Sequence, residues 1–258
     1  MLFTLSPAKK LDYDTPISVA NASQPRFVKE AGALIEVLQE KTPAEISALM
    51  KLSPALAELN AQRYLDWEPV FDDEHARPAI HAFNGDVYEG LDAGSLSARE
   101  LAWTQEHLVI LSGLYGALRP LDMMRPYRLE MGTRLAVGKT RNLYEFWGDT
   151  IASYLNERLA EQKGPAIIVN LASEEYFKSV RRNVLQARVV QCVFEDWKRD
   201  TYKVISFHAK RARGLIMRFA AQQRAKTPED LTEFSLEGYQ FDSSVSEADR
   251  LVFRRKTD

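Results

Sequence analysis

The segment VVQCVFEDWKRDTYKVISFH, Val189–His208, decides the class of fold. β-Branched and aromatic residues flank the polar turn Lys198-Arg199-Asp200. This pattern predicts two antiparallel strands, Val189–Trp197 and Thr201–His208. A hairpin of this kind next to parallel strands would make the central sheet a mixed one.

Outside the hairpin, strand and helix patterns alternate along the chain. Short apolar runs predict buried strands at Leu2–Leu5, His107–Leu111, Ala166–Leu171 and Arg250–Arg255. Capping signals and 3.6-residue periodicity predict helices at Arg26–Glu40, Thr42–Met50, Ser53–Asp66, Leu101–Glu106, Leu143–Glu161 and Ala209–Arg224. We therefore expect an α/β (α+β) fold in which one domain, residues 1–258, surrounds a mixed central sheet with helices.

Composition limits the class of protein. The chain has 258 residues, of which 45% are hydrophobic and 27% charged, so it can bury a sizeable core. Its one cysteine, Cys192, excludes an internal disulfide, as expected in a reducing compartment. Residues 1–10 lack a secretory apolar core, and no apolar run approaches the roughly 18 residues of a membrane helix. We expect a soluble cytoplasmic protein.

The charge is unevenly distributed. The net charge is −2, yet Tyr176–Lys226 holds 13 Lys and Arg against three Asp and Glu, and Arg119–Arg141 holds six against two. Such segregation favours a basic surface that binds a polyanion such as nucleic acid. The alternative is a solvated face whose charges pair with acidic residues elsewhere.

The expected helix Ala209–Arg224 concentrates this charge. Its apolar stripe comprises Ala212, Leu215, Ile216, Phe219 and Ala220. Its cations divide between two flanks, with Arg211 and Arg218 on one and Lys210, Arg213 and Arg224 on the other. Arrayed guanidinium groups suit phosphate oxygens. We expect Gly214 on the exposed side, where another backbone could approach closely.

Further cations extend this surface. Lys178, Arg181 and Arg182 follow a short helix opened by Ser173, and the turn Gly113–Gly116 precedes three arginines. The candidate DNA contacts are Lys9, Lys10, Arg119, Arg125, Arg128, Lys178, Arg181, Arg182, Lys210, Arg211, Arg213 and Arg218. The turn Lys51-Leu52-Ser53 joins two helices over about residues 42–66, so Lys51 and Ser53 are further candidates. A plain helical hairpin is the alternative, because the turn lacks glycine and Pro54 lacks an N–H.

Signals for catalysis, metals and cofactors are weak. Ser6-Pro7-Ala8-Lys9 matches S-x-x-K but lacks the companion motifs of serine acylases. The four histidines share no metal-ligand spacing, and no phosphate-loop or dinucleotide motif is present. We therefore expect neither cofactor nor metal, and a binding protein rather than an enzyme. The alternative is an enzyme acting on a nucleotide or small phosphorylated substrate in the same basic cleft, lined by Lys9, Tyr127, Arg128, Glu174 and Lys178.

Several blocks together resemble the YaaA family of bacterial peroxide-stress resistance proteins. They are Ser6–Lys9, Phe83–Tyr88, Leu111–Gly116, Leu118–Asp122, Pro126–Gly132, Leu143–Asp149, Asn170–Val180 and Ala209–Gly214. The resemblance implies a single-domain α/β fold with a basic cleft and a helix-hairpin-helix-like element. It also implies non-sequence-specific binding to double-stranded or branched DNA, and a role in limiting iron-driven oxidative damage. The candidate contacts inside matching blocks are Lys9, Arg128, Lys178, Lys210, Arg211 and Arg213.

Overall fold

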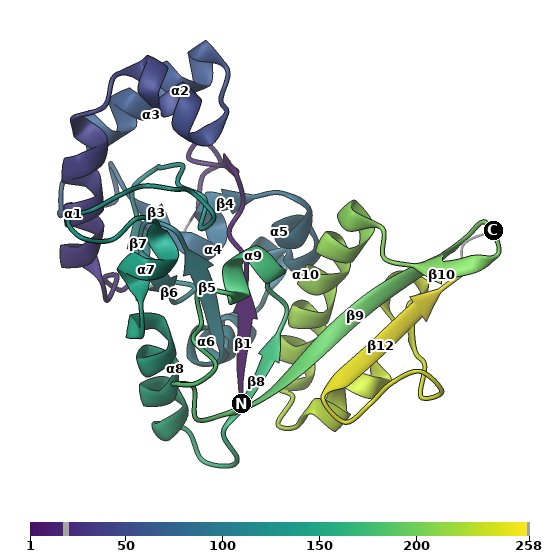
Figure 1. Cartoon of the computed structure of the whole chain (residues 1–258). Helices are drawn as coiled ribbons and strands as arrows, with labels where there is room; N and C mark the ends of the chain where they lie inside the picture. Colours follow the sequence, from purple (N-terminus) through teal and green to yellow (C-terminus); the bar gives the residue numbers. More distant parts are fainter. Residues whose placement is uncertain (18–20, 257–258) are drawn as a thin grey trace.

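The computed structural model describes residues 1–17 and 21–256. Within these residues, an eight-stranded sheet follows the order β11-β12-β9-β8-β1-β5-β6, with β10 paired to β9 (Figure 1). The strands are β1 Leu2–Leu5, β5 Leu108–Ser112, β6 Gly116–Leu118, β8 Ile167–Asn170, β9 Arg188–Lys198, β10 Thr201–Lys203, β11 Gln240–Phe241 and β12 Arg250–Arg255.

The sheet is mixed, which confirms the expected architecture. β1 pairs in parallel with β5 and β8, and β9 pairs in parallel with β8 and β12. β6, β10 and β11 join the sheet antiparallel. The chain passes from β1 to β5 on one side and later to β8 on the other. The carboxyl ends of β1 and β8 therefore form a topological switch point, where open α/β sheets bind ligands.

Helices surround the sheet (Figure 1). They are α1 Val28–Gln39, α2 Pro43–Met50, α3 Pro54–Leu65, α4 Ala79–Ala82, α5 Asp86–Leu91, α6 Ala98–His107, α7 Leu143–Trp147, α8 Thr150–Ala160, α9 Glu174–Phe177 and α10 Ser206–Gln223. Two small pairs complete the fold: β2 Lys10–Leu11 with β4 Phe83–Asn84, and β3 Arg77–Pro78 with β7 Met123–Met124. No helix in the described part of the chain is both long and apolar enough to cross a bilayer.

Two capping boxes begin helices where the sequence predicts them. Thr42 and Glu45 begin α2, and Ser97 and Glu100 begin α6, each through reciprocal side-chain to backbone hydrogen bonds. α2 and α3 form the expected helical hairpin, and Lys51 closes α2 in a left-handed conformation with φ 54°.

Three expected boundaries are wrong. The second strand of the hairpin ends at Lys203, and α10 begins at Ser206 rather than at Ala209. The helix expected over Leu143–Glu161 is two helices, because Gly148 adopts φ 47° and ends α7.

Helices α5 and α10 cross in contact at a pair of glycines. A Cβ on Gly214 would lie 1.8 Å from the Val87 carbonyl oxygen, and one on Gly90 would lie 2.3 Å from the Arg211 carbonyl oxygen. The expected close approach of another backbone is therefore confirmed. The expected exposure of Gly214 is wrong, because the approaching backbone of α5 buries it.

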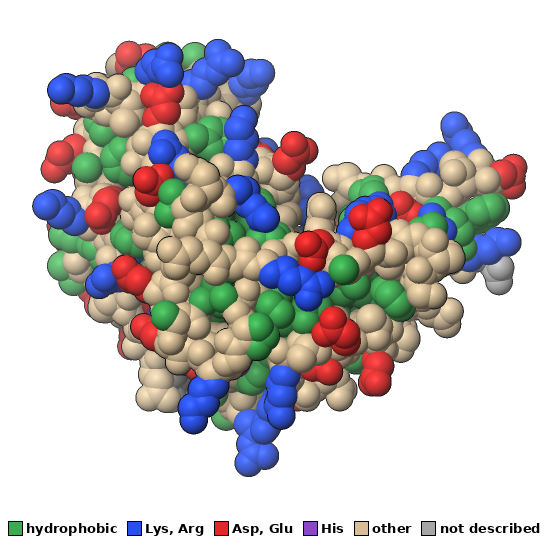
Figure 2. Space-filling model, turned by 60° about the horizontal axis from the view of Figure 1, so that its bottom comes forward, with side chains coloured by type: hydrophobic (Ala, Val, Ile, Leu, Met, Phe, Trp, Pro, Cys, Tyr) green, Lys and Arg blue, Asp and Glu red, His purple; other side chains and the backbone are tan. Residues whose placement is uncertain are grey.

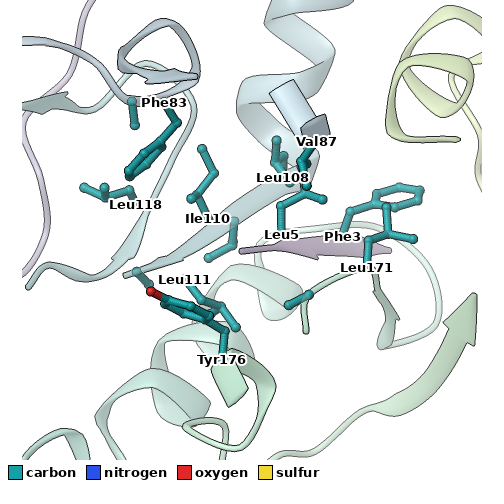
Figure 3. Packing of buried hydrophobic residues seen from close by; sticks show 14 of the residues in the cluster. Phe3, Leu5, Phe83, Val87, Leu108, Ile110, Leu111, Leu118, Leu171 and Tyr176 are labelled. Carbon is teal, nitrogen blue, oxygen red and sulfur yellow. The ribbon is translucent and has the colours of Figure 1, made fainter. Parts of the chain in front are cut away.

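The core fills both faces of the central strands. Figure 3 shows Leu108 and Ile110 on one side of β5, with Leu111 on the other beside Tyr176. This alternation follows from the two-residue period of a strand. All five residues of β5 and all four of β1 are buried, as parallel strands covered on both faces require.

Candidate functional site

Hydrogen bonds join the carboxyl ends of β1 and β8 at the switch point. The Asn170 carboxamide oxygen accepts from the Thr4 hydroxyl at 3.0 Å and from the Ala172 N–H at 2.9 Å. The Ser173 N–H donates to Ser6 Oγ at 2.9 Å. Both loops therefore leave the sheet in fixed directions, and the residues after each strand line the same space.

A cleft of about 460 Å³ opens at this point. The segment after β1 contributes Ser6–Lys10, the α5 region contributes Asn84–Val87, and the loop before α7 contributes Tyr127–Glu130. Leu171, Ser173, Glu175, Tyr176, Lys210 and Arg213 complete the lining. Its volume lies within the roughly 300–1,000 Å³ typical of small-ligand sites.

Glu130 organises two of the cations in the cleft. Its carboxylate lies 2.9 Å from Lys9 Nζ and 3.1 Å from an Arg128 guanidinium nitrogen. Arg128 Nε is buried and has no hydrogen-bond partner among the described residues. The Arg128 backbone carbonyl accepts from the Tyr64 hydroxyl, so α3 positions this arginine.

Arg213 is half-buried on α10 beside Cys192 of β9. Burial lowers its pKa, and in the described part of the chain its guanidinium has no ion-pair or hydrogen-bond partner. A partly desolvated cation without a counter-charge is costly. An anion bound in the cleft would offset that cost.

A second hollow, which we call the groove, adjoins the cleft and has a volume of about 850 Å³. Arg213 lines both hollows. Lys178, Arg181 and Arg182 also line the groove. Arg181 pairs with Asp149 at 2.8 Å, and Lys178 Nζ lies 5.1 Å from the centre of the Tyr144 ring.

Eight of the twelve predicted cations thus line two adjoining hollows: Lys9, Lys10, Arg128, Lys178, Arg181, Arg182, Lys210 and Arg213. Five carboxylates share these linings: Asp86, Glu130, Glu174, Glu175 and Asp249. The predicted cations therefore outnumber the carboxylates of the two linings by eight to five.

The other four predicted cations bind within the protein. Arg125 is buried and donates to the Asp66 and Val70 carbonyls at 2.9 Å each, which holds the end of α3. Arg218 donates to the Leu91 and Asp92 carbonyls at 3.1 and 3.0 Å.

Carboxylates hold the remaining two of these four. Arg211 forms a paired interaction with Glu237, with a shortest distance of 2.7 Å. Arg119 lies 3.5 Å from Asp122.

The helical hairpin lies outside both linings. Lys51 and Ser53 are exposed at the turn between α2 and α3, and Ser53 accepts from the Leu56 N–H to begin α3. The surface as a whole is not uniformly basic. Figure 2 shows Lys and Arg side chains interspersed with Asp and Glu side chains on the face in view.

The phenols around the cleft are donors rather than bases. Burial raises the pKa of Tyr88, Tyr127 and Tyr176, so each stays protonated at neutral pH. Tyr127 shares a 2.6 Å hydrogen bond with Ser112, and Tyr88 donates to the Ser6 carbonyl at 3.0 Å. Among residues 1–17 and 21–256, no three His, Cys, Asp or Glu side chains gather as a candidate metal site.

Sequence reasoning did not single out several residues of the cleft. Asn84, Glu130, Ser173 and Tyr176 lie in blocks that resemble the YaaA family, but their shared location depends on strand order. The signal that could have found them is the polar residue following each of two neighbouring parallel strands, Ser6 after β1 and Ser173 after β8.

The fold and the site together define an α/β protein with a cation-lined cleft at the switch point of its sheet. The family model described as peroxide stress protein YaaA matches residues 1–245, and the chain belongs to this family. It is 66% identical over 256 residues to a UPF0246 protein of Bordetella petrii, covering 99% of this chain and 100% of the relative. A UPF0246 protein of Bordetella avium is 64% identical over the full length of both chains, and one of Paracidovorax citrulli is 62% identical over 99% of each.

Proposed function

We propose that this protein binds the backbone of duplex or branched DNA without sequence specificity and helps limit iron-driven damage during peroxide stress. One observation carries the proposal: eight cations from four separate chain segments converge on two adjoining hollows that share Arg213. Guanidinium and ammonium groups spaced along the path of a DNA strand can each bind one of its successive phosphates.

The packing of α10 favours backbone contacts over base reading. A recognition helix needs a free face to enter the major groove. α10 instead buries eight of its 18 residues, with Gly214 packed against α5, so no whole face of the helix is free to enter a groove. Contacts of this kind position a protein on DNA but carry no sequence information.

Salt titration tests the proposal. We would measure affinity by fluorescence anisotropy for two duplexes of unrelated sequence and for a four-way junction. If all eight cations meet a phosphate, the logarithm of the binding constant should fall with a slope of about −7 against the logarithm of salt concentration. Six to ten contacts correspond to a loss of roughly 10³–10⁵-fold between 50 and 200 mM salt. Absence of binding at 50 mM salt, or a slope shallower than about −2, would overturn the proposal.

The link to iron-driven damage has its own test. Supercoiled plasmid is exposed to ferrous iron and hydrogen peroxide, with and without the protein, and strand breaks are counted on a gel. Protection should require the cations of the cleft, so the Lys210→Ala/Arg213→Ala variant should protect less. Equal nicking with and without the wild-type protein would contradict the proposed protection and leave only DNA binding.

The enzymatic alternative has one observation in its favour, the position of the cleft at the switch point of the sheet. Nucleotide-dependent α/β enzymes bind their ligands at this place. Lys9, Tyr127 and Arg128 line the cleft, whereas Glu174 and Lys178 line the groove, so the expected polar set is divided. Chromatography of nucleoside mono-, di- and triphosphates after incubation with the protein distinguishes the two functions, because only an enzyme would yield new products.

A further inference from the structure

The cleft and the groove differ in what they can hold. A duplex can lie along a surface, but a cleft of about 460 Å³ admits only a group the size of a single nucleotide. We infer that the cleft receives one unpaired nucleotide of the bound DNA, while the strand beside it continues past Arg213 into the groove. This inference rests on the proposed DNA binding and gives the cleft a ligand class of its own.

The lining has the chemistry that a base needs. Proteins hold an extruded base between apolar or aromatic side chains and bond its polar edge. Val87, Leu171 and the largely buried rings of Tyr127 and Tyr176 supply the apolar part. The phenols carry no negative charge at neutral pH, because burial raises their pKa.

Asn84 can supply the polar edge. Asn84 lines both the cleft and a neighbouring hollow beside Arg77 and Phe83, and its carboxamide has no side-chain hydrogen bond to any residue that the structure describes. A carboxamide offers two N–H donors and a carbonyl acceptor, the set that pairs with base edges. A free amide beside apolar walls therefore fits a base better than it fits a phosphate alone.

Two cations that are not fully paired lie where the flanking phosphates would be, although a terminal nitrogen of Arg128 contacts Glu130. Arg128 has its Nε buried without a partner on one side of the cleft, and Arg213 lies at the junction with the groove. Lys178, Arg181 and Arg182 continue the path beyond Arg213. A nucleotide in the cleft would thus be connected to a strand whose backbone follows cations in both directions.

Two of the three carboxylates that line the cleft are already engaged, which favours binding of the base over chemistry upon it. Glu130, a carboxylate of the cleft, already pairs with Lys9 and Arg128, and Glu175 accepts from the Gly132 N–H at 2.9 Å. The phenols are protonated, as described above. The cleft is therefore proposed as a holding pocket.

The test compares three DNA probes of the same length by fluorescence anisotropy. One is a fully matched duplex, one carries a single extra nucleotide with its base, and one carries the same extra position as an abasic tetrahydrofuran. Insertion of the base should make the second probe bind about 5- to 100-fold more tightly than either other probe. With 2-aminopurine as the extra base, its fluorescence should change on binding.

Two variants keep the result decisive. Ala8→Leu places bulk in the cleft, and Asn84→Ala removes the free amide without adding volume. Each should bring the affinity ratio of base-containing to abasic probe down towards one. Lys178→Ala, in the groove, should weaken all three probes by similar factors and preserve the ratio.

The outcomes separate this inference from the proposed function. Equal affinity for the base-containing and abasic probes, with matched duplex still bound, overturns the pocket and leaves DNA binding standing. Failure to bind any probe overturns both. Tight binding of a free nucleoside monophosphate with no preference among the probes also overturns the inference and favours a small-molecule site.

Discussion

The two flanks of α10 carry similar cations in different surroundings. On one flank, Arg211 pairs with Glu237, and Arg218 holds the carbonyls at the end of α5. On the other flank, Lys210 and Arg213 line the cleft, and Arg213 has no counter-charge in the described part of the chain. A count of positive residues treats the flanks alike. Their partners assign the first flank to folding and leave the second available to the proposed ligand.

The glycine crossing sets this division. Because Gly90 and Gly214 let the backbones of α5 and α10 touch, Arg218 reaches the Leu91 carbonyl. The opposite flank faces the cleft formed by the segment after β1. This division predicts the effects of three sets of substitutions and the reactivity of one thiol.

Gly214→Ala should lower the free energy of unfolding by about 3 kcal/mol, because its Cβ would lie 1.8 Å from the Val87 carbonyl oxygen and the helices must separate. Urea denaturation measures the loss. Gly94→Ala is the control, since its Cβ would meet no atom within 4 Å, and its stability should stay within about 0.5 kcal/mol of wild type. Equal stabilities for the two variants would contradict the close contact between α5 and α10 at Gly214.

Replacing Lys178, Arg181 and Arg182 together by alanine should make the salt slope of DNA binding shallower by about 3, because each substitution removes one proposed phosphate contact in the groove. Anisotropy titrations at several salt concentrations give the slope. Removing the exposed Lys29, Lys139 and Lys163, which lie outside both linings, should leave it unchanged. If both triple variants lower the slope equally, the groove has no special role.

Arg218→Ala should lower the free energy of unfolding by about 1–2 kcal/mol, because two backbone carbonyls lose a charged donor. Arg211→Ala, which removes only a partly exposed ion pair, should cost less than about 1 kcal/mol. Thermal or urea unfolding ranks them. The reverse order would mean that Glu237, rather than the end of α5, is the partner that matters for folding.

Cys192 should be unreactive, although it lies beside Arg213. Burial raises the pKa of its thiol to about 12, so very little thiolate is present at neutral pH. Its reaction with a disulfide reagent at pH 7.4 should be on the order of 10³-fold slower in the folded protein than in guanidinium. Oxidation of native Cys192 by peroxide within seconds would instead point to a thiol sensor.

Local signals in the sequence were reliable where one element decides its own shape. The capping boxes at Thr42 and Ser97 begin helices as expected, and the polar turn of the hairpin joins β9 to β10. These local signals failed where a segment distant in sequence packs against the element. Gly214 looked exposed because its neighbour α5 is remote in sequence, and no periodicity could indicate that backbone.

The candidate site also has features that the local sequence predicts and features that depend on distant segments. That basic residues gather could be predicted from charge segregation, and eight of them do line adjoining hollows. The sequence could not predict which of these basic residues bond within the fold. The partners of Arg125 and Arg218 are backbone carbonyls, which have no sequence signature. The cleft itself depends on β8 lying beside β1, a fact of strand order.

The most direct test compares two double variants, Lys210→Ala/Arg213→Ala and Arg211→Ala/Arg218→Ala, which remove the same charge from opposite flanks of one helix. The salt slope of DNA binding should become shallower by about 2 for the first pair and stay at the wild-type value for the second. Equal losses from both flanks, or a loss from the second alone, would contradict the division of α10 into a binding flank and a folding flank.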